Sequence, residues 1–143
     1  MKSALTILII VASVVASTLE QPAQDPKLGA NTVHGCYSSV GELQLNGKLV
    51  FNTMAQCAAT CSGLGASVAA SQEDSCYCGN SYPPANTLVD DSQCNEACPG
   101  YSLQACGGTA AFTVYNTGIE LNVANSPGDG SSSKVTISIS SIR

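Results

Sequence analysis

The stretch CYCGN, residues 76–80, places two cysteines on either side of Tyr77. Cysteines this close in sequence cannot readily bond to each other, because the chain would have to fold back too sharply. On an extended strand their sulfurs lie on the same side, roughly 6.6 Å apart, and Tyr77 projects to the opposite side. The stretch therefore predicts a strand with two disulfide-bonded cysteines on one face and an aromatic ring on the other.

The segment TMAQCAATCSGL, residues 53–64, has the pattern of a helix that could supply the partners. Thr53 is placed as the N-cap, and Gln56 follows three residues later, as in a capping box. Cys57 and Cys61 then stand at positions i and i+4 on one helix face, roughly 5–6 Å apart. This spacing nearly matches that of the strand cysteines, so two parallel bridges can join the helix to the strand. Spacing alone leaves open which strand cysteine pairs with which helix cysteine.

The chain begins with the features of a secretory signal peptide. Lys2 precedes an apolar run over residues 4–16, and small residues follow it. The run is too short for a transmembrane helix, which needs roughly 20 apolar residues. We therefore expect residues 1–17 to be a signal peptide, cleaved after residue 16 or 17. No second apolar run follows, so the mature chain is expected to have no transmembrane segment.

The chain has eight cysteines, and all of them lie between residues 36 and 106. An even number in a short secreted chain predicts a disulfide framework, here of four bridges. The alternative, a zinc site, is disfavoured, because the Cys-x-Cys and Cys-x-x-x-Cys spacings differ from those of zinc ribbons and His34 is the only histidine. The sequence thus indicates no metal and no cofactor.

Composition divides the mature chain into three parts. Residues 18–32 form a polar leader, residues 33–117 a compact domain, and residues 118–143 a Ser/Thr-rich tail that we expect to be disordered. Besides the helix, the sequence predicts several local elements. These are extended segments at 32–37, 67–70, 75–78 and 111–115, turns at 72–74 and at Asn46–Gly47 (the latter closing a hairpin), and one or two helical turns within 90–98.

Charge excludes two classes of partner. The chain has a formal net charge of −5. Between residues 35 and 118 a single lysine, Lys48, faces six acidic residues. Such a domain has almost nothing with which to neutralise phosphates, so nucleic acid and anionic membrane surfaces are poor partners.

Several motifs together resemble the WSC domain family. In order they are GlyCysTyrSer (35–38), MetAlaGlnCysAlaAlaThrCys (54–61), CysTyrCysGlyAsn (76–80), CysAsnGluAlaCys (94–98), CysGlyGly (106–108) and PheThrValTyr (112–115). The resemblance implies a small disulfide-rich α+β domain, with a PAN/apple-like antiparallel sheet crossed by one helix. It also implies four disulfide pairs, Cys36–Cys94, Cys57–Cys76, Cys61–Cys78 and Cys98–Cys106.

The same resemblance implies a function in the cell wall. WSC domains are the extracellular heads of fungal cell-wall stress sensors and are regarded as carbohydrate-binding modules. We therefore expect a secreted or cell-wall domain, or a truncated relative of a sensor, that binds a β-glucan-like wall polysaccharide without catalysis. Weak self-association, or attachment through the tail, would add to the hold of a single domain. The alternatives are a protein-interaction module and a secreted inhibitor or effector.

An enzyme is the less favoured interpretation. The paired acids Glu73–Asp74 and Asp90–Asp91 are neighbours in turns and diverge, whereas a glycosidase needs two carboxyl groups roughly 5–9 Å apart across a cleft. No cysteine is left over as a nucleophile.

Tyrosines are the predicted sugar contacts. A tyrosine ring offers an apolar face to a pyranose and a hydroxyl to its polar rim. Tyr82, in a loop stiffened by two prolines, is the first candidate, followed by Tyr77 and Tyr101; Tyr37 and Tyr115 are expected in the core. The polar side chains of Asn80, Asp90 and Asp91 are expected to bond sugar hydroxyls.

Overall fold

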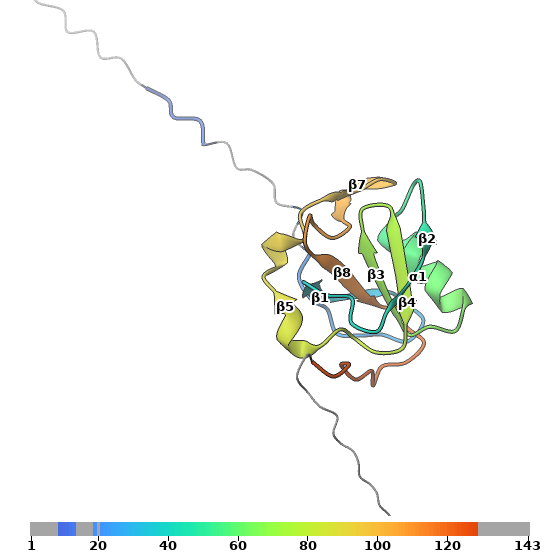
Figure 1. Cartoon of the computed structure of the whole chain (residues 1–143). Coiled ribbons are helices and arrows are strands. Elements are labelled where there is room, and N and C mark those ends of the chain that lie inside the picture. Colours follow the sequence, from blue (N-terminus) through green and yellow to red (C-terminus); the bar gives the residue numbers. More distant parts are fainter. Residues whose placement is uncertain (1–8, 14–18, 20, 129–143) are drawn as a thin grey trace, which may run out of the picture.

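The structure is a computed structural model that describes residues 9–13, 19 and 21–128 (Figure 1). Most of the expected signal peptide and the end of the tail, residues 129–143, lie outside the described residues. Signal cleavage and a disordered end therefore stay predictions. Within the described ranges, no helix is both long and apolar enough to cross a membrane.

One α-helix crosses an antiparallel sheet, which confirms the predicted fold class. The sheet has six strands in the order β2-β4-β3-β8-β1-β5, and a separate two-stranded sheet pairs β6 with β7. The elements are β1 (Thr32–Tyr37), β2 (Gln44–Lys48), α1 (Met54–Gly63), β3 (Val68–Gln72), β4 (Ser75–Gly79), β5 (Leu88–Val89), β6 (Ala97–Cys98), β7 (Tyr101–Ala105) and β8 (Phe112–Asn116), with short 3-10 helices η1 (Ala85–Thr87) and η2 (Asp91–Gln93).

The helix begins and ends where the sequence predicts. The hydroxyl of Thr53 accepts a hydrogen bond from the backbone N–H of Gln56 at 3.0 Å, which satisfies one of the first free donors of α1. At the other end Gly65 has a φ of 78°, and the N–H of Ala66 donates to the carbonyl of Cys61. Only a residue without a side chain adopts that φ without strain, so Gly65 ends the helix.

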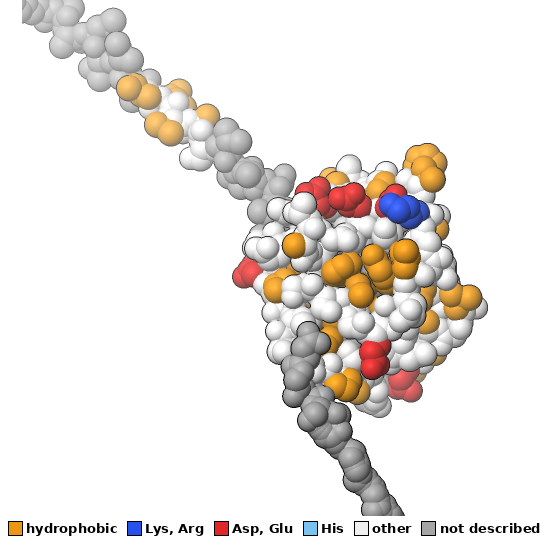
Figure 2. All heavy atoms as spheres, in the orientation of Figure 1, with side chains coloured by type: hydrophobic (Ala, Val, Ile, Leu, Met, Phe, Trp, Pro, Cys, Tyr) orange, Lys and Arg blue, Asp and Glu red, His pale blue; other side chains and the backbone are white. Residues whose placement is uncertain are grey.

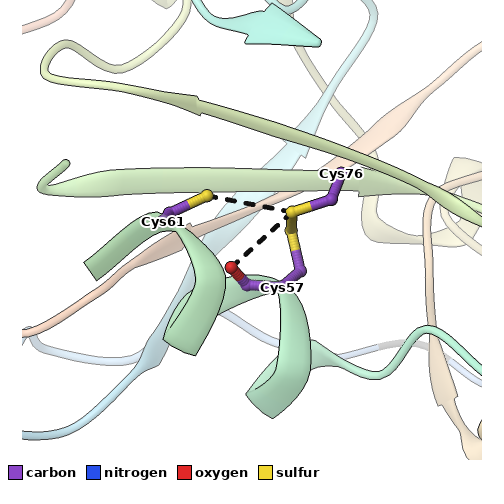
Figure 3. Close-up of side chains that lie close together, drawn as sticks. All are labelled: Cys57, Cys61 and Cys76. Carbon is purple, nitrogen blue, oxygen red and sulfur yellow. Dashed lines mark hydrogen bonds between the residues drawn. A yellow bond between two sulfur atoms is a disulfide. The ribbon is translucent and has the colours of Figure 1, made fainter. Parts of the chain in front are cut away.

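All eight cysteines form disulfides. The pairs are Cys36–Cys94, Cys57–Cys76, Cys61–Cys78 and Cys98–Cys106, the four that the family resemblance implies. Two of them join α1 to β4 side by side, with the Sγ atoms of Cys61 and Cys76 3.8 Å apart (Figure 3). The helix is thus attached covalently to the sheet at two adjacent points.

The sheet has a different core on each face. The helix-side core holds the helix cysteines and Met54, together with Tyr115 of β8 and Val33 of β1. The opposite core is built around Tyr37, Tyr82 and Val114. Side chains alternate between the two because successive residues of a strand point to opposite faces. Both Tyr37 and Tyr115 are buried, as predicted.

The predicted hairpin at Asn46–Gly47 is wrong. β2 runs straight through these two residues and pairs with β4, with a register shift between Leu45 and Gly47. Gly47 has a φ of 136°, so it serves as a bulge within the strand rather than as a turn. The chain continues along β4 instead of folding back, since the N–H of Leu49 bonds the carbonyl of Asp74.

Ordered packing extends beyond residues 33–117 on both sides. In the leader, the N–H of Gln24 donates to the carbonyl of Val33 at 2.8 Å, and that of Gly29 to the carbonyl of Gly118 at 2.9 Å. After β8, the carbonyl of Ala124 accepts from the N–H of Tyr82 at 2.9 Å. Residues 118–128 therefore differ from the disordered tail expected there, because their backbone is held by the loop before η1.

The segment 90–98 contains one helical turn, within the prediction of one or two. One turn of 3-10 helix, η2, is followed by β6, which pairs with β7. Cys94 is bonded to Cys36 of β1, and Cys98 is bonded to Cys106, which follows β7. The two halves of this segment are therefore attached to different strands.

Candidate functional site

The sheet face opposite the helix carries a partly open aromatic cluster. Tyr77 of β4 pairs directly with Leu45 of β2 and with Ala70 of β3, so the three side chains share that face. Phe112 of β8 meets Tyr77 edge to face, with ring centroids 5.5 Å apart and an interplanar angle of 87°. Ala70, on the intervening strand, is small enough to let the two rings meet.

We define the open aromatic face as Leu45, Tyr77 and Phe112. The two rings are half-buried, and Leu45 is 57% exposed. Figure 2 shows hydrophobic side chains gathered over β8, β3 and β4 on this side of the molecule. At its edge Lys48 bonds Asp74, with Nζ 3.2 Å from Oδ1. The face thus presents apolar surface beside a lysine that is already paired.

Tyr82 does not belong to this open face, which corrects the leading candidate for a sugar contact. Its side chain is 4% exposed and its ring stacks on His34 at 3.4 Å. The phenolic oxygen accepts a hydrogen bond from Nδ2 of Asn116 at 2.8 Å. The reason is the segment 118–128, which folds over the Tyr82 loop and covers this half of the sheet.

Burial also shifts the pKa values of Tyr82 and His34 in this covered half of the sheet. It raises the pKa of the Tyr82 phenol, although the hydrogen bond from Asn116 opposes the shift. It lowers the pKa of His34, which has Tyr82 on one side and Tyr37 at 5.9 Å. At neutral pH the stack is therefore uncharged, as a packed aromatic core requires.

The other predicted contacts are dispersed. Asn80 is exposed after β4, and its Oδ1 accepts from the N–H of Ser67 at 3.1 Å. Tyr101 is 49% exposed but lies on β7 of the smaller sheet. Neither contacts the open aromatic face through a hydrogen bond or a ring stack within the described part of the chain.

The two aspartates lie toward the opposite edge of the large sheet. Asp90 accepts a hydrogen bond from the N–H of Ser92 at 3.0 Å, which caps η2 and lowers the pKa of its carboxyl. Asp91 begins η2 and is half-buried. Three strands separate β5 from β4, so roughly 19 Å of sheet lies between these acids and Tyr77. The structure does not bring them together.

Sequence reasoning missed Leu45 and Phe112 as members of the site. Both lie in segments whose alternation is visible, yet which strands flank β4, and in what register, depends on contacts far apart in the chain. The position of Tyr77 opposite the cysteine face was the one available signal.

One group of residues has the geometry of a metal site. The sulfurs of Cys57, Cys61 and Cys76 lie within 4.8 Å of one another (Figure 3). Each sulfur belongs to a disulfide, and metal ligation by cysteine requires a thiolate. The cluster is accounted for by the paired bridges between α1 and β4.

The fold, the four bridges and the motif order define a small α+β domain that is cross-linked by disulfides. The chain belongs to the WSC domain family, whose sequence profile matches residues 33–108.

Its relatives include two cell wall integrity and stress response components and a xylosyltransferase. The chain is 37% identical over 90 residues to "Cell wall integrity and stress response component 2" of Saccharomyces cerevisiae, a match covering 59% of this chain and 18% of the relative. It is 34% identical over 90 residues to component 1 of Schizosaccharomyces pombe, covering 62% and 24%. It is 32% identical over 96 residues to "Xylosyltransferase oxt" of Drosophila melanogaster, covering 63% and 11%. The matched part is thus a quarter or less of each of these relatives.

Proposed function

We propose that this protein is a secreted or cell-wall module that binds a neutral, β-glucan-like wall polysaccharide without catalysis, and that the open aromatic face is its binding surface. The observation that carries the proposal is the edge-to-face pair of Tyr77 and Phe112, which packs on a buried apolar cluster of the same sheet face. The C–H side of a pyranose packs on such rings, and the Tyr77 hydroxyl can bond a sugar hydroxyl.

Charge supports a neutral ligand. Lys48 is paired with Asp74, so the face offers no free cation to an anionic polymer within the described residues. A neutral glycan does not respond to the net charge of the domain, so retention should depend little on salt. We expect weak affinity for a single domain, roughly 4–6 kcal/mol or millimolar to high micromolar. Many copies on one polymer would multiply that hold.

A binding role is also favoured over catalysis by the position of the acids. The two carboxyls of Asp90 and Asp91 follow each other on one short 3-10 turn, and the first is used as its cap. Glu73 and Asp74 share the tight turn between β3 and β4. Neither pair lies across a cleft from the other, as glycoside hydrolysis requires. The four disulfides fit an extracellular location, where such bridges persist.

The experiment is a pulldown of the mature protein with insoluble glucan, chitin and mannan at low and high salt. We expect retention on glucan at both salt concentrations. Tyr77→Ala should lower the affinity about tenfold, the equivalent of about 1.4 kcal/mol. Tyr77→Phe keeps the ring and should keep most of the retention.

Leu103→Ala is the matched control, because Leu103 is 71% exposed on β7, outside the open aromatic face. Thermal melts of each variant check that the fold is kept. No retention on any glycan would defeat the binding proposal. Equal retention of Tyr77→Ala and wild type would remove the open aromatic face as the site.

A protein-interaction module is the second candidate. Val50 and Phe51 are 77% and 72% exposed, and the hairpin residue Leu103 is 71% exposed. The loop that carries Val50 and Phe51 meets this hairpin, since the N–H of Gly100 donates to the carbonyl of Asn52 at 2.9 Å. Retention of a wall protein instead of a glycan, lost in Phe51→Ser, would favour this alternative.

A further inference from the structure

A pocket of about 350 Å³ lies between the leader, the start of α1 and β7. Ligand pockets in proteins span roughly 300–1,000 Å³, so one sugar-sized group fits. The described residues that line it are Gln21, Pro22, Gln24, Asn31, Val33, Met54 and Gln104. Every polar side chain in that lining is a carboxamide.

Three of these carboxamides are oriented by the backbone. The Oε1 atom of Gln21 accepts from the N–H of Ala105 at 3.0 Å, and that of Gln104 from the N–H of Met54 at 3.3 Å. Gln24 accepts at a longer 3.5 Å from the N–H of Val33. Each oxygen is therefore directed at the protein, and each NH₂ group is left as a donor. None of the three NH₂ groups donates to another residue of the described chain.

The floor of the pocket is apolar, and the described residues of its walls carry no formal charge. Val33 and Met54 are 3% and 6% exposed and belong to the helix-side core. With no cation or anion among the described lining residues, a charged ligand would find no partner of opposite sign there. The pocket thus combines several N–H donors with a small apolar floor, which matches a group that accepts hydrogen bonds at one end and is apolar at the other.

We propose that this pocket binds the acetamido group of a neutral N-acetylhexosamine residue. The acetamido carbonyl accepts hydrogen bonds from the glutamine NH₂ groups, and its methyl group packs on Met54 and Val33. A plain hexose hydroxyl supplies neither the strong carbonyl acceptor nor the methyl group. The site is distinct from the open aromatic face, because Val33 and Met54 lie in the helix-side core and Tyr77 projects from the opposite face of the sheet. The inference therefore does not depend on the proposed function.

The test uses two trisaccharides that differ at this group alone. Tri-N-acetylchitotriose carries the acetamido groups, and cellotriose has hydroxyls at the same positions. Titration of the isotope-labelled mature protein, followed by backbone NMR, should show binding of the first with shifts at the amides of Met54 and Ala105. Cellotriose should bind at least tenfold more weakly, as measured from the shifts of the same amides.

Gln21→Glu and Gln104→Glu each keep an oxygen that accepts from the backbone N–H but remove the NH₂ donor. We therefore expect each variant to fold as wild type and to bind tri-N-acetylchitotriose at least tenfold more weakly. Gln44→Glu, on exposed β2, is the control with the same charge change and should bind as wild type. Tyr77→Ala should leave this binding unchanged even if it abolishes glucan retention. Equal binding of the two trisaccharides, or no shift at Met54 and Ala105, would overturn the proposal.

Discussion

The two faces of the large sheet are closed by different means. On the helix side, the disulfides Cys57–Cys76 and Cys61–Cys78 join α1 to β4. On the other side, Tyr82 and its neighbours are covered by a loop and by residues 118–128, through hydrogen bonds and ring stacking. The covalent face depends on a few bonds, whereas the aromatic face depends on many contacts. The cysteines of the two bridges are buried, whereas Leu45 on the other face is 57% exposed.

The largest effect is expected from removing one of the two disulfides that join α1 to β4. The Cys57→Ala, Cys76→Ala double variant loses a bridge with a sequence separation of 19, worth about 3 kcal/mol by chain entropy. It also creates cavities in the core, because both cysteines are almost fully buried. We expect no cooperative thermal transition under oxidising conditions. The matched Cys98→Ala, Cys106→Ala variant, whose bridge spans 8 residues, should still melt cooperatively at a lower temperature. A cooperative melt of the first variant would contradict the prediction.

The next effect tests the packing of Tyr82, on the sheet face opposite the helix but outside the open aromatic face. Tyr82→Ala removes a buried ring and its stack on His34, so the free energy of unfolding should fall by about 3–5 kcal/mol. Tyr82→Phe keeps the ring and removes only the hydrogen bond to Asn116, and should cost about 1 kcal/mol. Urea unfolding of both variants measures the difference. An Ala variant as stable as the Phe variant would show that the ring is not packed.

A smaller effect is expected at the start of the helix. Thr53→Ala removes the side-chain oxygen that accepts from the N–H of Gln56, so stability should fall by about 1 kcal/mol. Exposed Thr109, outside the helix, is the control position, and its change to Ala should be nearly neutral. Chemical denaturation of the two variants side by side provides the measurement. An effect of Thr53→Ala as large as that of the double cysteine variant would mean that the cap, not the bridges, holds the helix.

The smallest effect is a pH dependence on the aromatic side. Burial lowers the pKa of folded His34 below its ordinary value of 6.5, so the unfolded chain takes up the proton first as the pH falls. Its contribution to stability is therefore complete above about pH 6.5 and is lost as the pH falls through the folded pKa. His34→Phe keeps a ring on Tyr82 but does not titrate. The difference in urea midpoint between wild type and this variant should change between pH 7.5 and pH 5; a constant difference would exclude His34 as the cause.

Local signals in the sequence predicted the covalent face well. The spacing of Cys57 and Cys61 on a helix and of the two cysteines around Tyr77 on a strand needed no knowledge of distant segments. The helix cap at Thr53 is equally local. The family resemblance then supplied the choice between alternative pairings, which spacing could not make.

The aromatic face was less predictable, because it depends on contacts between distant segments. The burial of Tyr82 follows from the return of residues 118–128. Apolar and polar residues alternate from Ile119 to Val123, but this alternation does not indicate which distant segment the stretch packs against. The meeting of Tyr77 and Phe112 depends on β3 lying between β4 and β8, a strand order that no local pattern encodes. The bulge at Gly47 looked like a turn, since an Asn-Gly pair is typical of both.

The hairpin that ends at Cys98 and Cys106 has a consequence for how such domains diverge. Its ends are joined by a disulfide, so amino-acid changes between them leave the closure of the loop intact. Gln104, on this hairpin, lines one wall of the pocket between the leader, α1 and β7. The leader forms another wall, and it lies outside the 33–108 family match. Both walls can therefore accumulate substitutions while the core between α1 and β4 stays constant. The acetamido preference proposed for this pocket can therefore change by substitutions in either wall without any change of the scaffold.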